Sequence, residues 1–283
     1  MEGLLVLDKP TGLTSRAALD RAARWFPRRT PLGHTGTLDP LATGVLVACV
    51  GPATRLADYI QRMGKAYRSL FRLGETSDTD DADGTVAPTG AGDPGEEAVR
   101  EALARFVGRL EQAPPAYSAA HVEGKRAYSL ARRGQEVKLE PRPVDVHGID
   151  VLRYGWPELE VEVHCGKGTY IRSLARDLGA MLGVGGHVSV LRRTRVGPFV
   201  PEMATPWDAE APRLLPMGLA LAGLPAVELS PEAARRMRTG QAVPGGAEGE
   251  CAAFCQGRVV AVCLGAGGLL RPVKVLGGVS PVP

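Results

Sequence analysis

Short apolar runs and amphipathic helical segments follow one another along residues 3–197 without a regular strand–helix repeat, and this pattern constrains the fold most strongly. A steady βα alternation would predict a parallel sheet with helices on both faces, whereas irregular interspersion favours an α+β fold. We therefore predict a mixed, mainly antiparallel sheet flanked by helices. The predicted strands cover residues 3–8, 44–50, 66–73, 144–153, 159–165 and 188–196, and the predicted helices begin near residues 15, 52, 93 and 169.

The chain changes character beyond residue 223. Residues 229–283 are rich in glycine and contain short apolar runs at 251–254, 259–264 and 273–276, which indicate a small β-barrel-like module. A chain of 283 residues is long enough for two unequal domains. We expect a large domain over residues 1–223 and the small module over residues 224–283.

Composition and charge exclude several classes of protein. No apolar run approaches the roughly 20 residues that a membrane helix needs, and the first ten residues lack the basic start of a signal peptide. A cytoplasmic protein without a membrane partner is expected. The five cysteines are scattered and form no Cys-x-x-Cys pair, so neither a disulfide framework nor a structural zinc site is expected. The formal net charge of +3 is small, so any surface that binds nucleic acid must be local.

The most unusual segment is the loop from Gly33 to Gly44, which reads GHTGTLDPLATG and precedes a buried strand. Its glycines allow tight turns and close approach to a ligand. Pro40 biases Asp39 towards an extended backbone, which presents one carboxylate in a defined pose at the edge of a sheet. An isolated Asp-Pro more often caps a turn, but the concentration of glycine, threonine and histidine here favours a functional loop.

This loop resembles the signature loop of the bacterial TruB-type tRNA pseudouridine synthases. Further resemblances follow in the family's order and cover residues 3–197, and the C-terminal part resembles a PUA-type RNA-binding module more loosely. The matching segments are LVLDKPTG at residues 5–12, KAYR at 65–68, DTDDADG at 78–84, CGKGTYIR at 165–172 and HVSVLRR at 187–193.

The resemblance implies a role for individual residues. The family's target is the uridine at position 55 in the T-loop of tRNA, which implies the T-arm stem-loop as partner and base flipping as the means of access. No obligatory protein partner is evident, and a monomer is expected. The implied roles are Asp39 as catalytic aspartate, His34 displacing and replacing the flipped base, Tyr67 stacking on the target ring, Arg172 pairing with Asp39, and Tyr170 and Leu191 lining the pocket.

The chemistry of the residues agrees with this assignment. Conversion of uridine to pseudouridine breaks a C–N bond and forms a C–C bond without redox change or group transfer, so no cofactor and no metal are expected. Asp39 can act as a nucleophile or move protons, and an adjacent guanidinium would keep it ionised. Attack at C6, attack at C1′ and proton abstraction all remain open.

The acidic segment 75–92 suggests two other functions that its residues argue against. A calcium loop starting at Thr79 lacks the first aspartate and has Gly90 where the bidentate glutamate belongs. The DADGT run resembles the start of haloacid-dehalogenase-type phosphatases, but a polar segment rather than a buried strand precedes it. We expect a solvated turn beside the cleft, whose carboxylates are candidates to position basic side chains.

A non-catalytic RNA-binding protein is the main alternative from another class. The basic runs at residues 125–126, 132–133 and 192–195, together with the C-terminal module, would suffice for phosphate contacts. This alternative leaves the Asp39 loop unexplained. Whether unmodified tRNA is chemically changed by the protein distinguishes the two.

Overall fold

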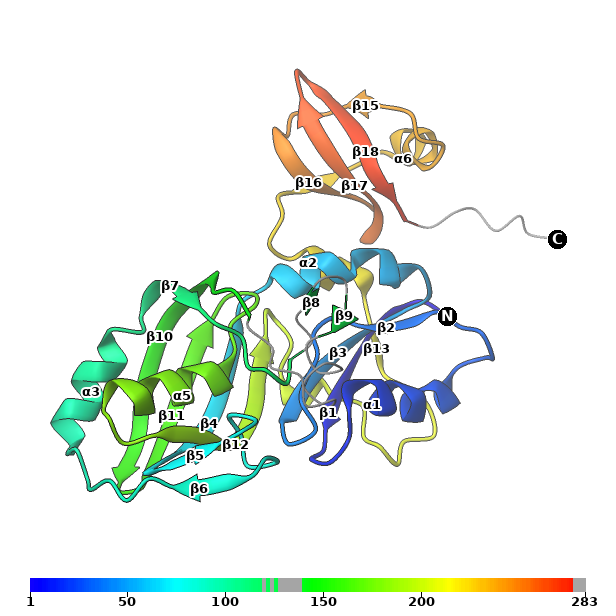
Figure 1. Ribbon diagram of the computed structural model, residues 1–283. Coiled ribbons are helices and arrows are strands. Elements are labelled where there is room, and N and C mark those ends of the chain that lie inside the picture. Colours follow the sequence, from blue (N-terminus) through cyan, green and yellow to red (C-terminus); the bar gives the residue numbers. More distant parts are fainter. Residues whose placement is uncertain (119–120, 123–124, 127–138, 277–283) are drawn as a thin grey trace.

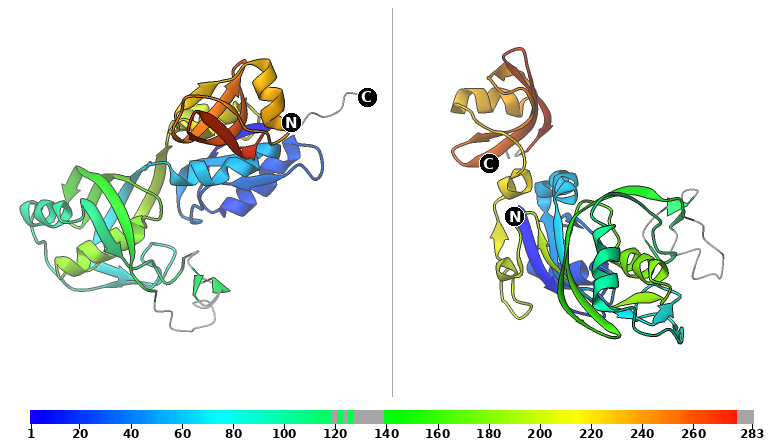
Figure 2. Two further views of the ribbon diagram at one scale, coloured as in Figure 1. Left: turned by 90° about the horizontal axis from the view of Figure 1, so that it is seen from above. Right: turned by 90° about the vertical axis from the view of Figure 1, so that its left-hand side faces the viewer.

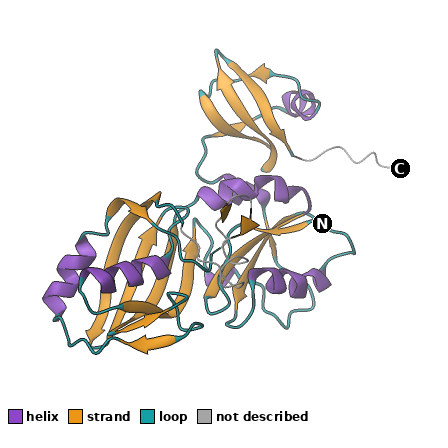
Figure 3. Cartoon of the chain, viewed as in Figure 1, coloured by secondary structure: helices purple, strands orange, loops and turns teal. Residues whose placement is uncertain are grey.

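The computed structural model describes residues 1–118, 121–122, 125–126 and 139–276. None of the helices in these residues is long and apolar enough to cross a membrane. Figures 1 and 3 show a large mixed sheet with helices against it and a smaller sheet above.

The large sheet forms the body of the protein. Its order is β13-β1-β3-β12-β4-β11-β10-β7, and β2 pairs with β3 beside this path. Pairing is antiparallel along the sheet except between β3 and β12, which run parallel at Thr43–Arg192 and Gly44–Arg193. The predicted mixed, mainly antiparallel α+β sheet is therefore confirmed. Its strands are β1 (Gly3–Lys9), β2 (Leu32–His34), β3 (Thr43–Val50), β4 (Lys65–Leu73), β7 (Gly108–Gln112), β10 (Arg142–Gly155), β11 (Glu158–Cys165), β12 (Gly186–Val196) and β13 (Leu214–Leu215).

The central strands are buried on both faces. Alternate residues of a strand point to opposite faces, so Leu5 and Leu7 of β1 enter one apolar cluster while Leu4 and Val6 enter another. The α-helices of this part are α1 (Ser15–Ala22), α2 (Ala57–Arg62), α3 (Glu96–Ala104) and α5 (Ile171–Met181), and the 3-10 helices are η1 (Ala23–Trp25), η2 (Gly51–Leu56), η3 (Pro201–Met203) and η4 (Met217–Leu221). The first apolar cluster lies under α1, α3 and α5, and the second lies under η2, α2 and η4.

Four local predictions need correction. The loop predicted at 33–44 begins within strand β2, and the acidic segment 75–92, expected to be a turn, contains the hairpin of β5 (Glu75–Ser77) and β6 (Val86–Pro88). The helix expected from residue 52 begins as the 3-10 turn η2 before α2 continues it. The helix predicted from near residue 93 begins at Glu96, because Gly95 occupies the N-cap position; the Asp93 Oδ1 accepts from the Gly95 amide at 2.8 Å instead of capping the helix.

The predicted C-terminal β module is present as a second sheet of order β14-β16-β17-β18-β15, with α6 packed against it. Figure 2 shows it beside α2 of the large domain. The Tyr59 hydroxyl donates to Glu250 at 2.7 Å, and Ala252 and Val259 share an apolar cluster with Leu56. The two parts therefore share core, and a boundary at residue 223 stays a prediction. The elements are β14 (Ala226–Glu228), α6 (Pro231–Arg238), β15 (Val243–Pro244), β16 (Gly249–Cys255), β17 (Arg258–Ala266) and β18 (Leu269–Val275); a short pair, β8 (His121–Val122) and β9 (Lys125–Arg126), lies apart from both sheets.

Candidate active site

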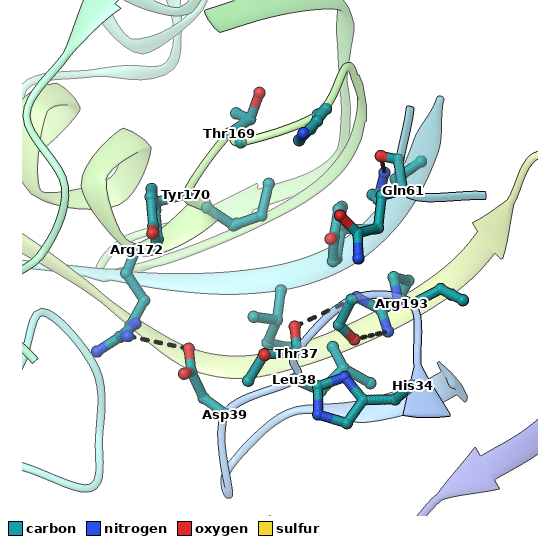
Figure 4. A pocket seen from close by; sticks show the side chains of 17 residues that line it. His34, Thr37, Leu38, Asp39, Gln61, Thr169, Tyr170, Arg172 and Arg193 are labelled. Carbon is teal, nitrogen blue, oxygen red and sulfur yellow. Dashed lines mark hydrogen bonds and ion pairs between the residues drawn. The ribbon is translucent and has the colours of Figure 1, made fainter. Parts of the chain in front are cut away.

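A cavity of about 350 Å³ lies beside the parallel junction of β3 and β12 in the large sheet. Its walls come from the loop after β2, from β4, from β12 and from the segment that leads into α5. Figure 4 shows side chains from these elements converging on it. The structure brings together the whole set of candidate site residues, since His34, Asp39, Tyr67, Tyr170, Arg172 and Leu191 all line this pocket.

Asp39 and Arg172 form an ion pair at one end of the pocket. Arg172 Nη2 lies 3.0 Å from Asp39 Oδ2, and Nη1 lies 3.0 Å from Asp81 Oδ2. The two nitrogens also donate to the carbonyls of Thr79 and Tyr117, each at 2.8 Å. Arg172 is the second residue of α5, and its side chain is only 5% exposed. The guanidinium therefore bridges two carboxylates and two loops.

The protonation of Asp39 responds to partial burial and to its charged neighbours, and its side chain remains 35% exposed. Removal from water raises the pKa of this carboxyl above its ordinary value, Asp81 raises it further, and Arg172 and Lys9 lower it. The expectation that the guanidinium keeps Asp39 ionised is thus only partly met: Arg172 acts in that direction, but burial outweighs it. Arg172 thus restrains the Asp39 carboxylate, while partial burial makes it easier to protonate than an exposed aspartate.

The acidic segment after β5 is only partly the solvated turn that we expected, since Asp78 and Asp83 are exposed and Asp81 is not. Asp81 is only 3% exposed, and its Oδ1 accepts from the Thr79 hydroxyl at 2.6 Å and from the Asp83 amide at 3.1 Å. Asp80 pairs with Arg176 at 2.9 Å, one turn beyond Arg172 on α5. The expectation that these carboxylates position basic side chains is confirmed, because each holds an arginine of α5.

The remaining candidates form the sides of the pocket. Tyr67 and Leu191 are 8% and 6% exposed, on the adjacent strands β4 and β12. Burial raises the pKa of the Tyr67 phenol, while the nearby Arg193 guanidinium lowers it. Tyr170 precedes α5, and Gln112 of β7 fixes its backbone by accepting from its amide at 2.8 Å and donating to its carbonyl at 3.1 Å. His34 ends β2 opposite Ala48.

Sequence reasoning missed the buried charges around the Asp39 loop. Lys9 is fully buried, and its Nζ donates to the carbonyls of Leu13 at 2.6 Å and Pro40 at 3.2 Å; burial lowers the pKa of Lys9 to about 8. Arg193 is 2% exposed and lines the pocket, although the sequence placed it in a run suited to phosphate contacts. Both residues lie in segments that resemble the family, Lys9 in residues 5–12 and Arg193 in residues 187–193, and this resemblance was the available signal. Their residue types alone did not indicate which groups they contact.

The other basic residues predicted to contact phosphates differ in their exposure and in their partners. Arg192 pairs with Asp8 at 2.7 Å, which leaves Arg195 as the exposed arginine of that run. Residues 125–126 form β9, and residues 132–133 lie outside the described part of the chain. No group of three or more His, Cys, Asp or Glu in the described residues is placed to hold a metal ion.

The cavity is lined by an aromatic ring, an apolar side chain and a carboxylate, namely Tyr67, Leu191 and Asp39. Such a lining is compatible with a planar ring as ligand. A carboxylate so placed can attack an electrophilic carbon or accept a proton.

Comparison with known proteins identifies close similarities. Residues 24–171 match the model of the TruB family pseudouridylate synthase N-terminal domain, and residues 172–209 match the tRNA pseudouridylate synthase B C-terminal domain. The chain is 44% identical to the tRNA pseudouridine synthase B of Gloeobacter violaceus, with 98% of this chain and 99% of that protein covered. It is 43% identical to the protein of the same name from Ruegeria pomeroyi, with 97% and 95% covered.

Solved structures show the same fold. A Cbf5–Nop10–Gar1 complex contains a chain with a TM-score of 0.72 and 26% identity, covering 96% of this chain and 84% of that one. An H/ACA RNP bound to a substrate RNA containing 2′-deoxyuridine contains a chain with a TM-score of 0.73 and 24% identity, covering 99% and 87%.

Proposed function

The chain belongs to the TruB family of pseudouridylate synthases, and we propose that it converts the uridine at position 55 of the tRNA T-loop to pseudouridine. Membership makes it an RNA pseudouridine synthase whose reaction is the isomerisation of uridine to pseudouridine in tRNA. The observation that carries the residue-level proposal is the Asp39–Arg172 ion pair at 3.0 Å, inside a pocket that Tyr67 also lines.

Access to this pocket requires the target base to leave its stack. Asp39 lies among side chains from four elements, and a uridine stacked inside an RNA helix could not bring its ring to that carboxylate. In the proposed complex the uracil ring stacks on Tyr67 with Leu191 against its edge. His34 lies on the opposite wall from α5, where it can occupy the space that the base leaves (Figure 4).

The reaction moves one glycosidic bond. The bond between N1 and C1′ breaks, a bond between C5 and C1′ forms, C5 loses a proton and N1 gains one, so the composition of the RNA is unchanged. Asp39 would act in its ionised form by attack at C6, by attack at C1′ or by abstracting a proton. Each route needs the carboxylate in one rotamer, and the Nη2 contact from Arg172 supplies that restraint.

We also propose that residues 224–283 bind RNA and that the protein needs no obligatory protein partner. Helix α6 carries Arg235, Arg236 and Arg238 in its last turn, on a module next to the large domain, which supports contact with phosphates.

The proposal is tested by mapping pseudouridine along a full-length unmodified tRNA after incubation with the protein. We expect one new pseudouridine at position 55 and none in a transcript in which that uridine is replaced by cytidine. Pseudouridine formed at another position, with position 55 unchanged, would refute the proposed target. RNA that binds without any chemical change would favour the non-catalytic alternative.

A further inference from the structure

The loop that carries Asp39 is held along its whole length. Each backbone carbonyl from Gly36 to Leu41 accepts a hydrogen bond, most of them from segments distant in the sequence. A loop with so many fixed carbonyls has little freedom to move its aspartate. Arg193 donates to the carbonyls of Gly36 at 3.0 Å and Thr37 at 3.4 Å, and Ser15 donates to that of Leu38 at 3.0 Å. The Ala42 amide donates to Asp39, the Gly12 amide and Lys9 donate to Pro40, and Thr11 donates to Leu41, at 3.1, 2.8, 3.2 and 3.3 Å respectively.

Ser15 holds the residue immediately before Asp39. Its hydroxyl accepts from the Leu38 amide at 2.7 Å and donates to the Leu38 carbonyl at 3.0 Å. Ser15 is the first residue of α1 and is only 2% exposed. The N-cap of this helix is Thr14, whose hydroxyl accepts from the Ala17 amide at 3.0 Å. The Ser15 hydroxyl is therefore not needed to cap the helix and serves the loop instead.

Arg193 holds the loop from the other side. Its guanidinium donates to the Val45 carbonyl at 2.7 Å and to the Gly36 carbonyl at 3.0 Å, so it ties the arm before Asp39 to strand β3. No carboxylate of the described residues pairs with it within 4.0 Å. Burial of an unpaired cation costs several kcal/mol unless hydrogen bonds replace its water. The loop carbonyls supply those acceptors, which couples the charge to the loop.

The parallel junction of the sheet brings Arg193 to this position. Gly44 pairs with Arg193 and has a φ of 98°, and a Cβ on Gly44 would lie 2.2 Å from the Arg193 carbonyl oxygen. Glycine at residue 44 is thus required for β12 to approach β3 where the Asp39 loop ends. The side chain of Arg193 then lies beneath the loop and beside the pocket.

We propose that Ser15 and Arg193 are positioning residues for the isomerisation, which hold the backbone on the N-terminal side of Asp39 so that its carboxylate meets the Arg172 guanidinium and the target ring. This inference rests on the proposed function. Neither residue needs to touch the reacting atoms. Removal of either set of hydrogen bonds allows the loop to shift, and a shift of about 1 Å can slow a reaction roughly a hundredfold.

The test is a single-turnover assay with the enzyme in saturating excess over unmodified T-arm stem-loop, in which the rate constant of pseudouridine formation and the folded fraction of each variant are measured separately. For Ser15→Ala we expect a rate constant about ten- to a hundredfold below wild type, a wild-type folded fraction and an RNA affinity within about threefold of wild type. Arg193→Lys keeps the positive charge but loses the planar guanidinium with its several N–H donors, and we expect its rate constant to fall by a similar factor.

Two neighbouring substitutions are matched controls. Thr14→Ala removes the N-cap of the same helix without touching the loop, so the melting temperature should fall while the rate constant stays at the wild-type value. Arg192→Lys alters the adjacent arginine, which pairs with Asp8 instead of the loop, and should leave the rate constant unchanged.

The folded fraction, measured from a melting curve, separates positioning from simple instability. A reduced folded fraction with a wild-type rate constant would mean that the substitution only destabilises the protein and would overturn the positioning role. Ser15→Ala with a wild-type rate constant would overturn it as well, even if Arg193→Lys failed to fold. Wild-type protein that forms no pseudouridine would overturn the proposed function, whereas active wild type with unaffected variants would overturn this inference alone.

Discussion

Replacement of Arg172 by lysine is the most informative single change at the ion pair. Its Nη1 and Nη2 share four acceptors, namely the carboxylates of Asp39 and Asp81 and the carbonyls of Thr79 and Tyr117. Lysine keeps the charge but has one nitrogen, which cannot reach acceptors arranged around a planar fork. We therefore expect the lysine to keep some of these hydrogen bonds and to give up its restraint on Asp39.

The size of the effect follows from the strength of the hydrogen bond between Arg172 and Asp39. A hydrogen bond between charged groups contributes about 1.5–3 kcal/mol. If that restraint acts fully in the transition state, Arg172→Lys should slow the chemical step about 10- to 150-fold. RNA affinity should change less, because the guanidinium side chain is only 5% exposed and its four acceptors all belong to the protein.

Single-turnover kinetics measure this directly, because they separate the chemical step from product release. Arg176→Lys is the matched control: it lies one turn further on α5, pairs with Asp80 at 2.9 Å and does not line the pocket. Its rate constant should remain near the wild-type value. An Arg172→Lys variant that reacts as fast as wild type would refute the idea that this guanidinium aims Asp39.

Three further predictions concern pH, cofactors and the C-terminal module. Because burial raises the pKa of Asp39, the single-turnover rate should fall on acidification at a higher pH than an exposed aspartate would give, and a rate unchanged down to about pH 4 would contradict this. Chelator should leave activity intact while the RNA stays folded, and activity that disappears in chelator and returns with a divalent ion would contradict the expected absence of a metal. Deletion of residues 226–283 should weaken RNA binding and flatten its salt dependence, and it should lower the melting temperature because Leu56 and Tyr59 lose apolar partners in the module. An unchanged salt slope would show that the module does not touch RNA.

Periodicity predicted the sheet well where burial follows a simple rule. Strand β3 is apolar throughout because Leu46 and Ala48 face one core and Val45 and Val47 face the other, and the sequence shows this as a continuous apolar run. Helix α5 was equally clear, since its apolar residues recur at helical spacing and Gly183 follows its end. Short elements such as β2 were missed, because three residues are too few to show a period.

Buried charges were the other part that the sequence did not predict. Asp81 lies in a segment of acidic residues that looks solvated, and its buried charge is paired with Arg172, on a helix far along the chain. Arg193 and Val45 are 148 residues apart in the sequence, and their contact depends on the parallel junction between β12 and β3. Such contacts follow from the topology of the sheet, which local residue patterns do not specify. Family resemblance brought the pocket residues together, but it did not indicate what holds them.

Pseudouridine mapping on a T-arm stem-loop with wild type and Asp39→Asn tests whether Asp39 performs the chemistry in this pocket. Asparagine keeps the shape of the side chain but can act neither as the nucleophile nor as the base. We expect complete conversion by wild type and none by the variant, while RNA affinity changes by less than about tenfold, or ~1.4 kcal/mol. Substantial conversion of the target uridine by Asp39→Asn would contradict the account.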